Sequence, residues 1–183
     1  MTRPRILIAG IGNIFLGDDA FGIEVARKLS QRQLPDEVKI VDFGIRGLDL
    51  AYMLLDGYET VILVDTVSRG GTPGTLYVLE PEIGEAAENS AGGVEGHNLD
   101  PMKVLRLAAS MGGEVGHVML VGCEPELPAD AEDMRTELSD PVRAAVGEAV
   151  QLIESLVAKL LSEPERQRGK GTLAGARART ENR

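Results

Sequence analysis

The sequence has little of what several classes of protein need. A single cysteine, Cys123, excludes an intrachain disulfide bond and is typical of a reducing compartment. No apolar stretch reaches the roughly 20 residues that a membrane-spanning helix needs. Residues 1–5 lead straight into an apolar run and do not resemble a signal peptide. We therefore expect a cytoplasmic protein with no membrane partner.

Positive charge is also scarce. The chain of 183 residues has 19 Lys and Arg against 29 Asp and Glu, a net charge of −10 at pH 7. Nucleic-acid binders carry basic surfaces, so this charge argues against a nucleic-acid partner. The length is enough for one domain with a buried core. We assign residues 1–163 to a single α/β domain and residues 164–183, which are basic and lack an apolar face, to a disordered tail.

Apolar runs that end in glycine or in acidic residues indicate an α/β fold. Strands are predicted at residues 6–9, 38–41, 60–64, 75–79 and 118–121, and helices near residues 19–29, 48–55, 99–111 and 139–161. The connection between the third and fourth strands is too short for a helical crossover, so the fourth strand is predicted to be antiparallel or at an edge. The pattern predicts a three-layer α/β/α sandwich around a mostly parallel sheet of about five strands.

Helical periodicity and capping preferences give further local predictions. Asp18 is expected to cap the first helix, and Ser139 the last. Residues 80–95 are predicted to form a long surface loop. The apolar face of the short second helix is predicted to consist of Leu48, Ala51, Leu54 and Leu55.

Three positions bear side chains suited to chemistry: the pair Asp18 and Asp19, then Asp65, then His97. The first and third strands of a parallel sheet end at the same edge, where such folds place their sites. Two carboxylates and an imidazole there would suit a divalent transition metal such as Zn, Ni, Mn or Fe. Each position also has a structural interpretation: a helix cap for the acidic pair, a loop residue for Asp65, and a cap or surface residue for His97.

Other candidate sites fit their motifs less well. Gly10-Ile11-Gly12 opens like a dinucleotide-binding fingerprint, but Phe15 stands where the third glycine is required. Cys123 has no His–acid pair nearby, and we interpret it as a small buried residue. His117 opens an apolar strand and is interpreted as structural.

Several short blocks follow one another along the chain: GIGNIFLGDDAFG at 10–22, DFGIRG at 42–47, VILVD at 61–65, PGT at 73–75, GHNL at 96–99 and VGCEP at 121–125. In this order they resemble the hydrogenase maturation proteases, the endopeptidases that trim the C-terminus of the large subunit of nickel–iron hydrogenases. The resemblance covers nearly all of the chain before the last helix.

The resemblance implies an α/β/α sandwich and a set of functional residues. Asp19, Asp65 and His97 would contact the metal and form the catalytic site, while Asp18 remains a helix cap. Asp42 and Gly44, in a second glycine turn, would lie near the cleft and bind substrate.

The resemblance also implies how the metal is used. The nickel would arrive in the large-subunit precursor, so that precursor lacking nickel is not cut, and no nucleotide would be needed. Either the metal activates a water or the scissile carbonyl, or a carboxylate acts as general base. The alternatives are a maturation chaperone of the same fold that does not cut, and a Rossmann-like nucleotide binder. We expect a monomer.

Overall fold

A single mixed sheet forms the centre of the protein. The computed structural model describes residues 4–81, 100–126 and 136–162. The strand order is β2-β1-β3-β5-β4, with β4 antiparallel to β5 and the other pairs parallel. The predicted five-stranded sheet with one antiparallel edge strand is therefore confirmed. Its strands are β1 (Ile6–Ile11), β2 (Val38–Gly44), β3 (Thr60–Thr66), β4 (Leu76–Leu79) and β5 (His117–Cys123).

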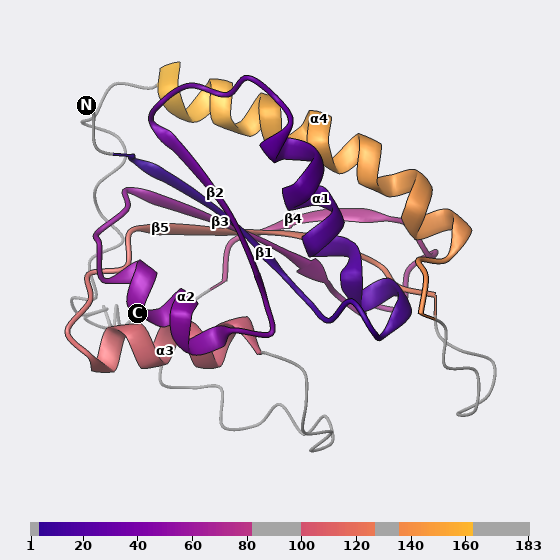
Figure 1. Cartoon of the computed structure of the whole chain (residues 1–183), viewed down its shortest axis with the longest axis horizontal. Helices are drawn as coiled ribbons and strands as arrows, with labels where there is room; N and C mark the ends of the chain where they lie inside the picture. The colour runs from indigo at the N-terminus through magenta and orange to yellow at the C-terminus, as the bar shows by residue number, and fades with distance from the viewer. Residues whose placement is uncertain (1–3, 82–99, 127–135, 163–183) are drawn as a thin grey trace, which may run out of the picture.

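Helices cover both faces of the sheet, as predicted. Figure 1 shows α1 and α4 above the sheet and α2 and α3 below it. A short 3-10 helix, η1, joins the end of β1 to α1. The bounds are η1 (Gly17–Ala20), α1 (Phe21–Ser30), α2 (Gly47–Leu54), α3 (Pro101–Ser110) and α4 (Asp140–Ser162).

The alternation of side chains along β1 and β3 divides the interior into two cores. Ile6 and Ile8 pack with α1 and α4, whereas Leu7 and Ala9 pack with α2 and α3. Every residue of β1 is buried, which explains why the run reads as continuously apolar rather than alternating.

Glycine allows α1 to lie directly on the sheet. A Cβ atom at Gly22 would come within 2.1 Å of the Val64 carbonyl oxygen and 2.3 Å of the Ile11 carbonyl oxygen. Only glycine permits such an approach. It fixes the start of α1, and with it η1, against the ends of β1 and β3.

The prediction for the buried face of α2 was wrong at two positions. Leu50, Ala51 and Leu54 are buried, but Leu48 and Leu55 are exposed. The sequence of α2 is apolar on two sides, so helical periodicity alone does not define which side meets the sheet. The packing against β2 and α3 decides it.

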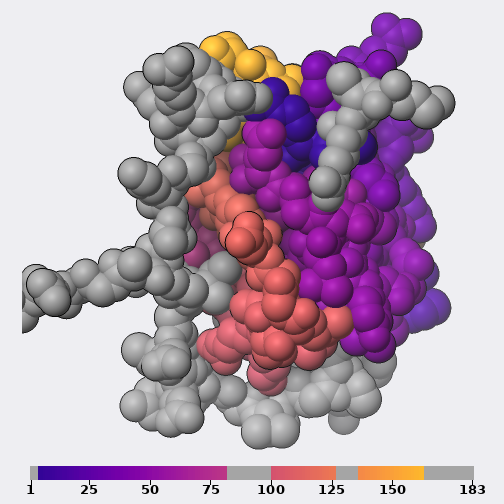
Figure 2. All heavy atoms as spheres, turned by 90° about the vertical axis from the view of Figure 1, so that its left-hand side faces the viewer, coloured from indigo at the N-terminus to yellow at the C-terminus, as the bar shows by residue number. Residues whose placement is uncertain are grey.

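Loops lie along the edge of the sheet at which the parallel strands begin, opposite to the edge at which they end. Figure 2 views this edge and shows the segments before β3 (purple) and β5 (salmon) side by side. The His117 N–H donates to the Glu59 carbonyl oxygen, and the His117 Nε2 lies 3.2 Å from Glu80 Oε1. His117 is thus remote from the edge where the candidate site lies.

Some predictions fall on residues outside the described ranges. Most of the predicted loop at 80–95 and all of the tail at 164–183 belong to them, so both stay predictions. Within the described ranges, no helix combines the length and the apolar character needed to cross a membrane.

Candidate active site

Asp65 ends the central strand at the carboxyl edge of the sheet. It follows Val64, which pairs with Gly10 of β1. Its side chain is only 8% exposed. The Asp65 Oδ1 accepts a hydrogen bond of 2.8 Å from the Thr66 N–H. The topology therefore places one carboxyl group, nearly out of contact with water, at the sheet edge where open α/β folds form their sites.

Asp19 reaches the same edge because η1 folds back over the end of β1. The Asn13 N–H donates to the Asp19 carbonyl oxygen at 3.2 Å, and the Asp19 N–H donates to the Leu16 carbonyl oxygen at 3.1 Å. Gly12 has a φ of +139°, and a Cβ there would lie 1.7 Å from the Asp19 carbonyl oxygen. The second glycine of the loop is needed for this return of the chain, not for binding a phosphate.

The two carboxyl groups are close enough to influence each other. Burial is the main cause that raises the pKa of Asp65 to about 8, and the charge of Asp19 adds to it. The Thr66 N–H opposes the rise by stabilising the carboxylate. Burial also raises the pKa of Asp19, against the Asn13 N–H and the Thr66 hydroxyl, whose oxygen lies 3.5 Å from Asp19 Oδ1. A pair of one buried and one half-buried carboxyl group favours either a retained proton or a bound cation.

Asp100 is a third acidic residue at this edge, and sequence reasoning missed it. Its charge is among the causes that raise the pKa of Asp65. Asp100 is also the N-cap of α3, because its Oδ1 accepts a hydrogen bond of 2.9 Å from the Met102 N–H. The dipeptide Asp100-Pro101 is a recognisable helix start and was the available signal.

Asp18 does not cap the helix that follows it, so that prediction was wrong. Neither η1 nor α1 has a side-chain cap. The Asp18 carboxylate instead accepts hydrogen bonds from the Glu126 N–H at 2.8 Å, the Ser139 N–H at 2.6 Å and the Ser139 hydroxyl at 2.9 Å. Asp18 thus ties η1 to the segment after β5 and to the start of α4. Ser139 directly precedes α4, but its hydroxyl donates to Asp18, and its capping of α4 stays a prediction.

Asp42 and Gly44 lie at the end of β2, on the far side of β1 from Asp65. Gly10 pairs with Asp42 on one side and with Val64 on the other. Strands are about 4.8 Å apart, so the Cα atoms of Asp42 and Val64 are separated by about 10 Å. Gly44 has a φ of +55°, and its carbonyl oxygen accepts a hydrogen bond from Gly12. The structure does not join Asp42 to the carboxyl pair, and its role in substrate binding stays a prediction.

His97 lies outside the described residues, three positions before Asp100. Among residues 4–81, 100–126 and 136–162, no group of three His, Cys, Asp or Glu side chains is arranged to hold a metal ion. The structure therefore brings Asp19 and Asp65 together and leaves the imidazole of the predicted set as a prediction.

The VGCEP block at the end of β5 has a structural explanation. Cys123 is buried, and burial raises the pKa of its thiol to about 12, so it is no nucleophile. Burial alone would raise the pKa of Glu124, but hydrogen bonds from the Arg69 and Gly70 N–H groups and from the Tyr77 hydroxyl lower it. Glu124, whose role the sequence did not reveal, holds the loop that follows β3.

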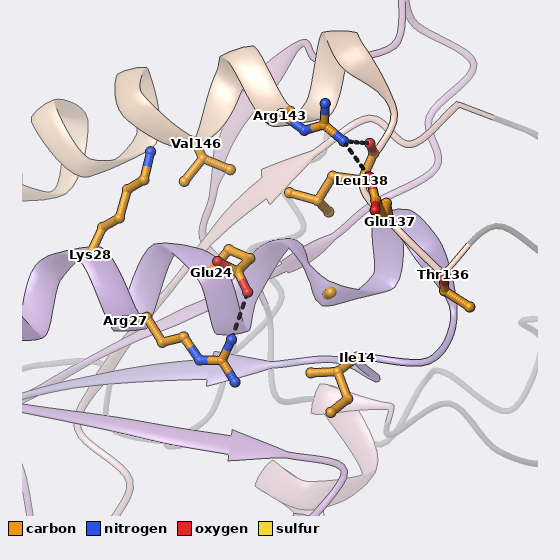
Figure 3. A pocket seen from close by; sticks show the side chains of 10 residues that line it. Ile14, Glu24, Arg27, Lys28, Thr136, Glu137, Leu138, Arg143 and Val146 are labelled. Carbon is orange, nitrogen blue, oxygen red and sulfur yellow. Dashed lines mark hydrogen bonds and ion pairs between the residues drawn. The ribbon is translucent and has the colours of Figure 1, made fainter.

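An open cavity of about 430 Å³ lies between α1 and the start of α4, and neither Asp19 nor Asp65 lines it. Figure 3 shows Glu24 paired with Arg27 on one wall and Arg143 paired with Glu137 on the other. Ile14, from the loop after β1, closes one end. On each wall these charges pair with one another, and neither wall contributes a residue of the carboxyl pair.

Comparisons with known proteins agree with this geometry. The family model for hydrogenase maturation proteases matches residues 23–156. The chain belongs to the hydrogenase maturation protease family. It is therefore a peptidase, an endopeptidase of hydrogenase maturation.

Individual relatives of the protease extend over most of its length. A putative hydrogenase maturation protease of Methanocaldococcus jannaschii is 31% identical over 154 residues, which cover 84% of this chain and 96% of the relative. The hydrogenase expression/formation protein HoxM of Azotobacter vinelandii is 32% identical, with 87% of this chain and 75% of the relative covered.

Solved structures show the same fold for the protease. The hydrogenase maturating endopeptidase HybD from Escherichia coli superposes with a TM-score of 0.70 at 27% identity, covering 85% of this chain and 93% of that one. A hydrogenase 2 maturation peptidase from a Thaumarchaeota archaeon gives a TM-score of 0.62 at 34% identity, covering 84% and 98%.

Proposed function

We propose that the protease removes a C-terminal peptide from the nickel-loaded large-subunit precursor of a nickel–iron hydrogenase, and that it recognises the precursor by its nickel. Asp19, Asp65 and His97 bind the nickel that the precursor carries. The observation that carries this proposal is the pair formed by the buried Asp65 and the half-buried Asp19 at the carboxyl edge of the sheet.

The pair fits a cation better than it fits an ordinary protein substrate. Burial raises the pKa of both carboxyl groups, so the pair holds a proton near neutral pH in the absence of metal. A divalent ion between the two oxygens would replace that proton and allow both carboxylates to ionise. Two carboxylates with one imidazole form a mixed oxygen and nitrogen set that suits nickel among other transition metals.

The chain connection is short enough for His97 to join the pair. His97 lies three positions before Asp100, and an extended chain spans at most about 3.6 Å per residue, or about 11 Å in all. The charge of Asp100 acts on Asp65, so α3 begins near the pair. This proximity supports His97 as the third ligand without fixing its orientation.

Holding the metal of the substrate, rather than a resident metal, makes nickel insertion a condition for cleavage. Precursor without nickel lacks the group that the carboxyl pair binds, and it gains nothing from the site. Asp19 and Asp65 would then act first as recognition groups, and the polypeptide next to the bound nickel would be the part that is cut.

A processing assay tests the proposal. The protease is mixed with the host's large-subunit precursor, with and without inserted nickel, and the masses are measured by mass spectrometry. We expect loss of one C-terminal peptide only from the nickel-loaded form. Asp65→Asn and His97→Ala should each abolish that loss, while Asp36→Asn, in an exposed turn, should not.

Each other result has a definite meaning. Cleavage of both precursor forms would retain the protease assignment and remove nickel recognition. Stable binding of the nickel-loaded form without cleavage would favour a chaperone role. Full activity of the Asp65→Asn variant would remove the carboxyl pair from the mechanism.

A further inference from the structure

Large apolar side chains are exposed on two segments that follow β1 and β2, at the edge of the sheet where the carboxyl pair lies. Phe15 is 70% exposed, Ile45 60%, and Leu48 and Tyr52 56% each. Ile14 and Leu16 are exposed as well. We call this set the apolar rim, and it consists of Ile14, Phe15, Leu16, Ile45, Leu48 and Tyr52.

The two segments of the rim leave the same edge of the sheet from neighbouring strands. Residues 14–16 follow β1, and Ile45 follows β2 directly. The Gly12 N–H donates to the Gly44 carbonyl oxygen at 3.1 Å, which joins the two turns. Figure 1 shows the loop after β1 and the turn before α2 on the same lower side of the sheet.

The helix α2 also has apolar side chains that do not pack against the rest of the protein. Leu50, Ala51 and Leu54 already fill its contact with the sheet, yet Leu48 and Tyr52, four residues apart, project on the outer side. The exposed Asp49, which pairs with Arg46, follows Leu48, so the outer side of α2 carries two large apolar side chains beside one ion pair. Exposed apolar surface of this kind marks an interaction site, and aromatic side chains such as Phe15 and Tyr52 are the usual anchors.

The loop that bears Phe15 also holds Asp19. The Asn13 N–H and the Leu16 carbonyl oxygen bracket the backbone of Asp19. A polypeptide that brings a metal to Asp19 would therefore lie beside residues 14–16 of the rim, and the Gly12–Gly44 hydrogen bond places the turn before α2 next to that loop.

We propose that the apolar rim is the docking surface for the folded body of the protein substrate. The proposal rests on the proposed function, because the substrate is the precursor that carries the metal to the carboxyl pair. The rim provides affinity through apolar contacts, and the carboxyl pair tests for the metal. The rim thus acts on binding of the precursor and not on the cleavage step.

The test uses the full-length protease and nickel-loaded large-subunit precursor. The rim variant is the double substitution Leu48→Ser and Tyr52→Ser, which leaves the buried side of α2 intact. The control is Val78→Ser, because Val78 is 42% exposed on β4, at the opposite edge of the sheet from β2. Circular dichroism and thermal unfolding verify that each variant is folded.

We expect the rim variant to raise KM for the precursor by about tenfold or more, because each tenfold corresponds to about 1.4 kcal/mol of lost affinity. The kcat should stay within about twofold, and Val78→Ser should match the wild type. Unchanged KM, or a lower kcat at unchanged KM, would overturn the proposal. So would a wild-type dimer in sedimentation that the rim variant converts to monomer, since the occupant would then be a second copy.

Binding separates this proposal from the proposed function. If the wild type does not cut the precursor, the proposed function fails, and capture of the precursor on immobilised protease then decides the role of the rim. Capture by the wild type and by Val78→Ser but not by the rim variant supports docking. Equal capture by all three, or by none, overturns it.

Discussion

At Asp65 the fold keeps an acidic group where water hardly reaches it. Burial raises its pKa to about 8, and the charges of Asp19 and Asp100 add to the effect. Such a group costs stability when it is ionised and unpaired. Stability is commonly given up at sites where a cation or a substrate later pairs with the buried charge. We therefore expect that replacing the carboxyl group of Asp65 raises the stability of the fold and abolishes activity.

The pH dependence of unfolding tests the expected effect on stability. In the unfolded chain Asp65 releases its proton near pH 3.8, whereas in the folded chain it holds the proton up to about pH 8. The folded state binds more protons at Asp65 between these values, so the contribution of Asp65 to stability is most favourable below about pH 4 and falls as the pH rises to about 8. The Asp65→Asn variant lacks this loss. We expect it to be more stable than the wild type at pH 8, by at most about 5 kcal/mol at 1.36 kcal/mol per pKa unit.

The measurement is urea unfolding of metal-free protein at pH 5, 6, 7 and 8. The difference between the two proteins should shrink steadily toward pH 5, because the remaining titrating groups are common to both. Asp36→Asn, in an exposed turn, serves as the control and should follow the wild type. Parallel curves for Asp65→Asn and the wild type would show that Asp65 has an ordinary pKa.

Asp18 has the opposite effect on stability. Its carboxylate receives two N–H groups and one hydroxyl, from Glu126 and Ser139. Hydrogen bonds to a charged group contribute about 1.5–3 kcal/mol each, and they share one carboxylate here. We expect Asp18→Ala to lower the free energy of unfolding by about 3 kcal/mol in urea titrations. Asp36→Ala should change it by less than about 0.5 kcal/mol, and an equally small effect of Asp18→Ala would contradict the bridging role.

At the scale of elements, the sequence predicts the sheet better than it predicts the loops and caps. The buried strands can be recognised in the sequence as apolar runs. The short connection before β4 predicts an antiparallel or edge strand, and β4 is antiparallel to β5. The positions of Asp19 and Asp65 at one edge follow from that topology. The bridging role of Asp18 was not predicted because its partners, Glu126 and Ser139, are over 100 residues away in the chain. Local preferences carry no information on contacts of that kind.

Replacing two helical glycines by alanine should have opposite effects on the free energy of unfolding, because the two helices are packed differently. A Cβ at Gly22 of α1 would meet backbone oxygens of β1 and β3, whereas a Cβ at Gly147 of α4 would meet nothing within 4 Å. Gly22→Ala should therefore force α1 off the sheet and lower the free energy of unfolding by about 3 kcal/mol or more. Gly147→Ala should raise it by about 1 kcal/mol, because alanine is the better helix former.

Thermal and urea unfolding of the two alanine variants, each compared with the wild type, provide the check. The same chemical change at two helical sites makes each variant the control for the other. Similar effects at both sites would mean that the close approach of α1 to the sheet is not needed. Loss of precursor binding in Gly22→Ala alone would follow from the shift of η1, which places Asp19.

Over the whole molecule, charge is unevenly distributed between the main part of the chain and its C-terminal residues. The net charge is −10, and the last 19 residues carry six basic side chains against two acidic ones. The family match ends at residue 156, and Val157 is the last buried residue of α4. The buried core and the proposed docking surface both lie within the residues that precede the tail. We therefore expect residues 1–163, the acidic part of the molecule, to fold and to cleave without the tail.

Deleting residues 164–183 tests that assignment. We expect the free energy of unfolding to change by less than about 0.5 kcal/mol, because the deletion removes none of the buried residues of α4. The kcat/KM for nickel-loaded precursor should stay within about twofold at physiological salt. If the tail instead recruits an acidic partner, the truncated protein will process the precursor more slowly at low salt, and the difference will vanish at 0.5 M salt because screening removes it. Measuring kcat/KM for both proteins at the two salt concentrations decides between a passive tail and an electrostatic one.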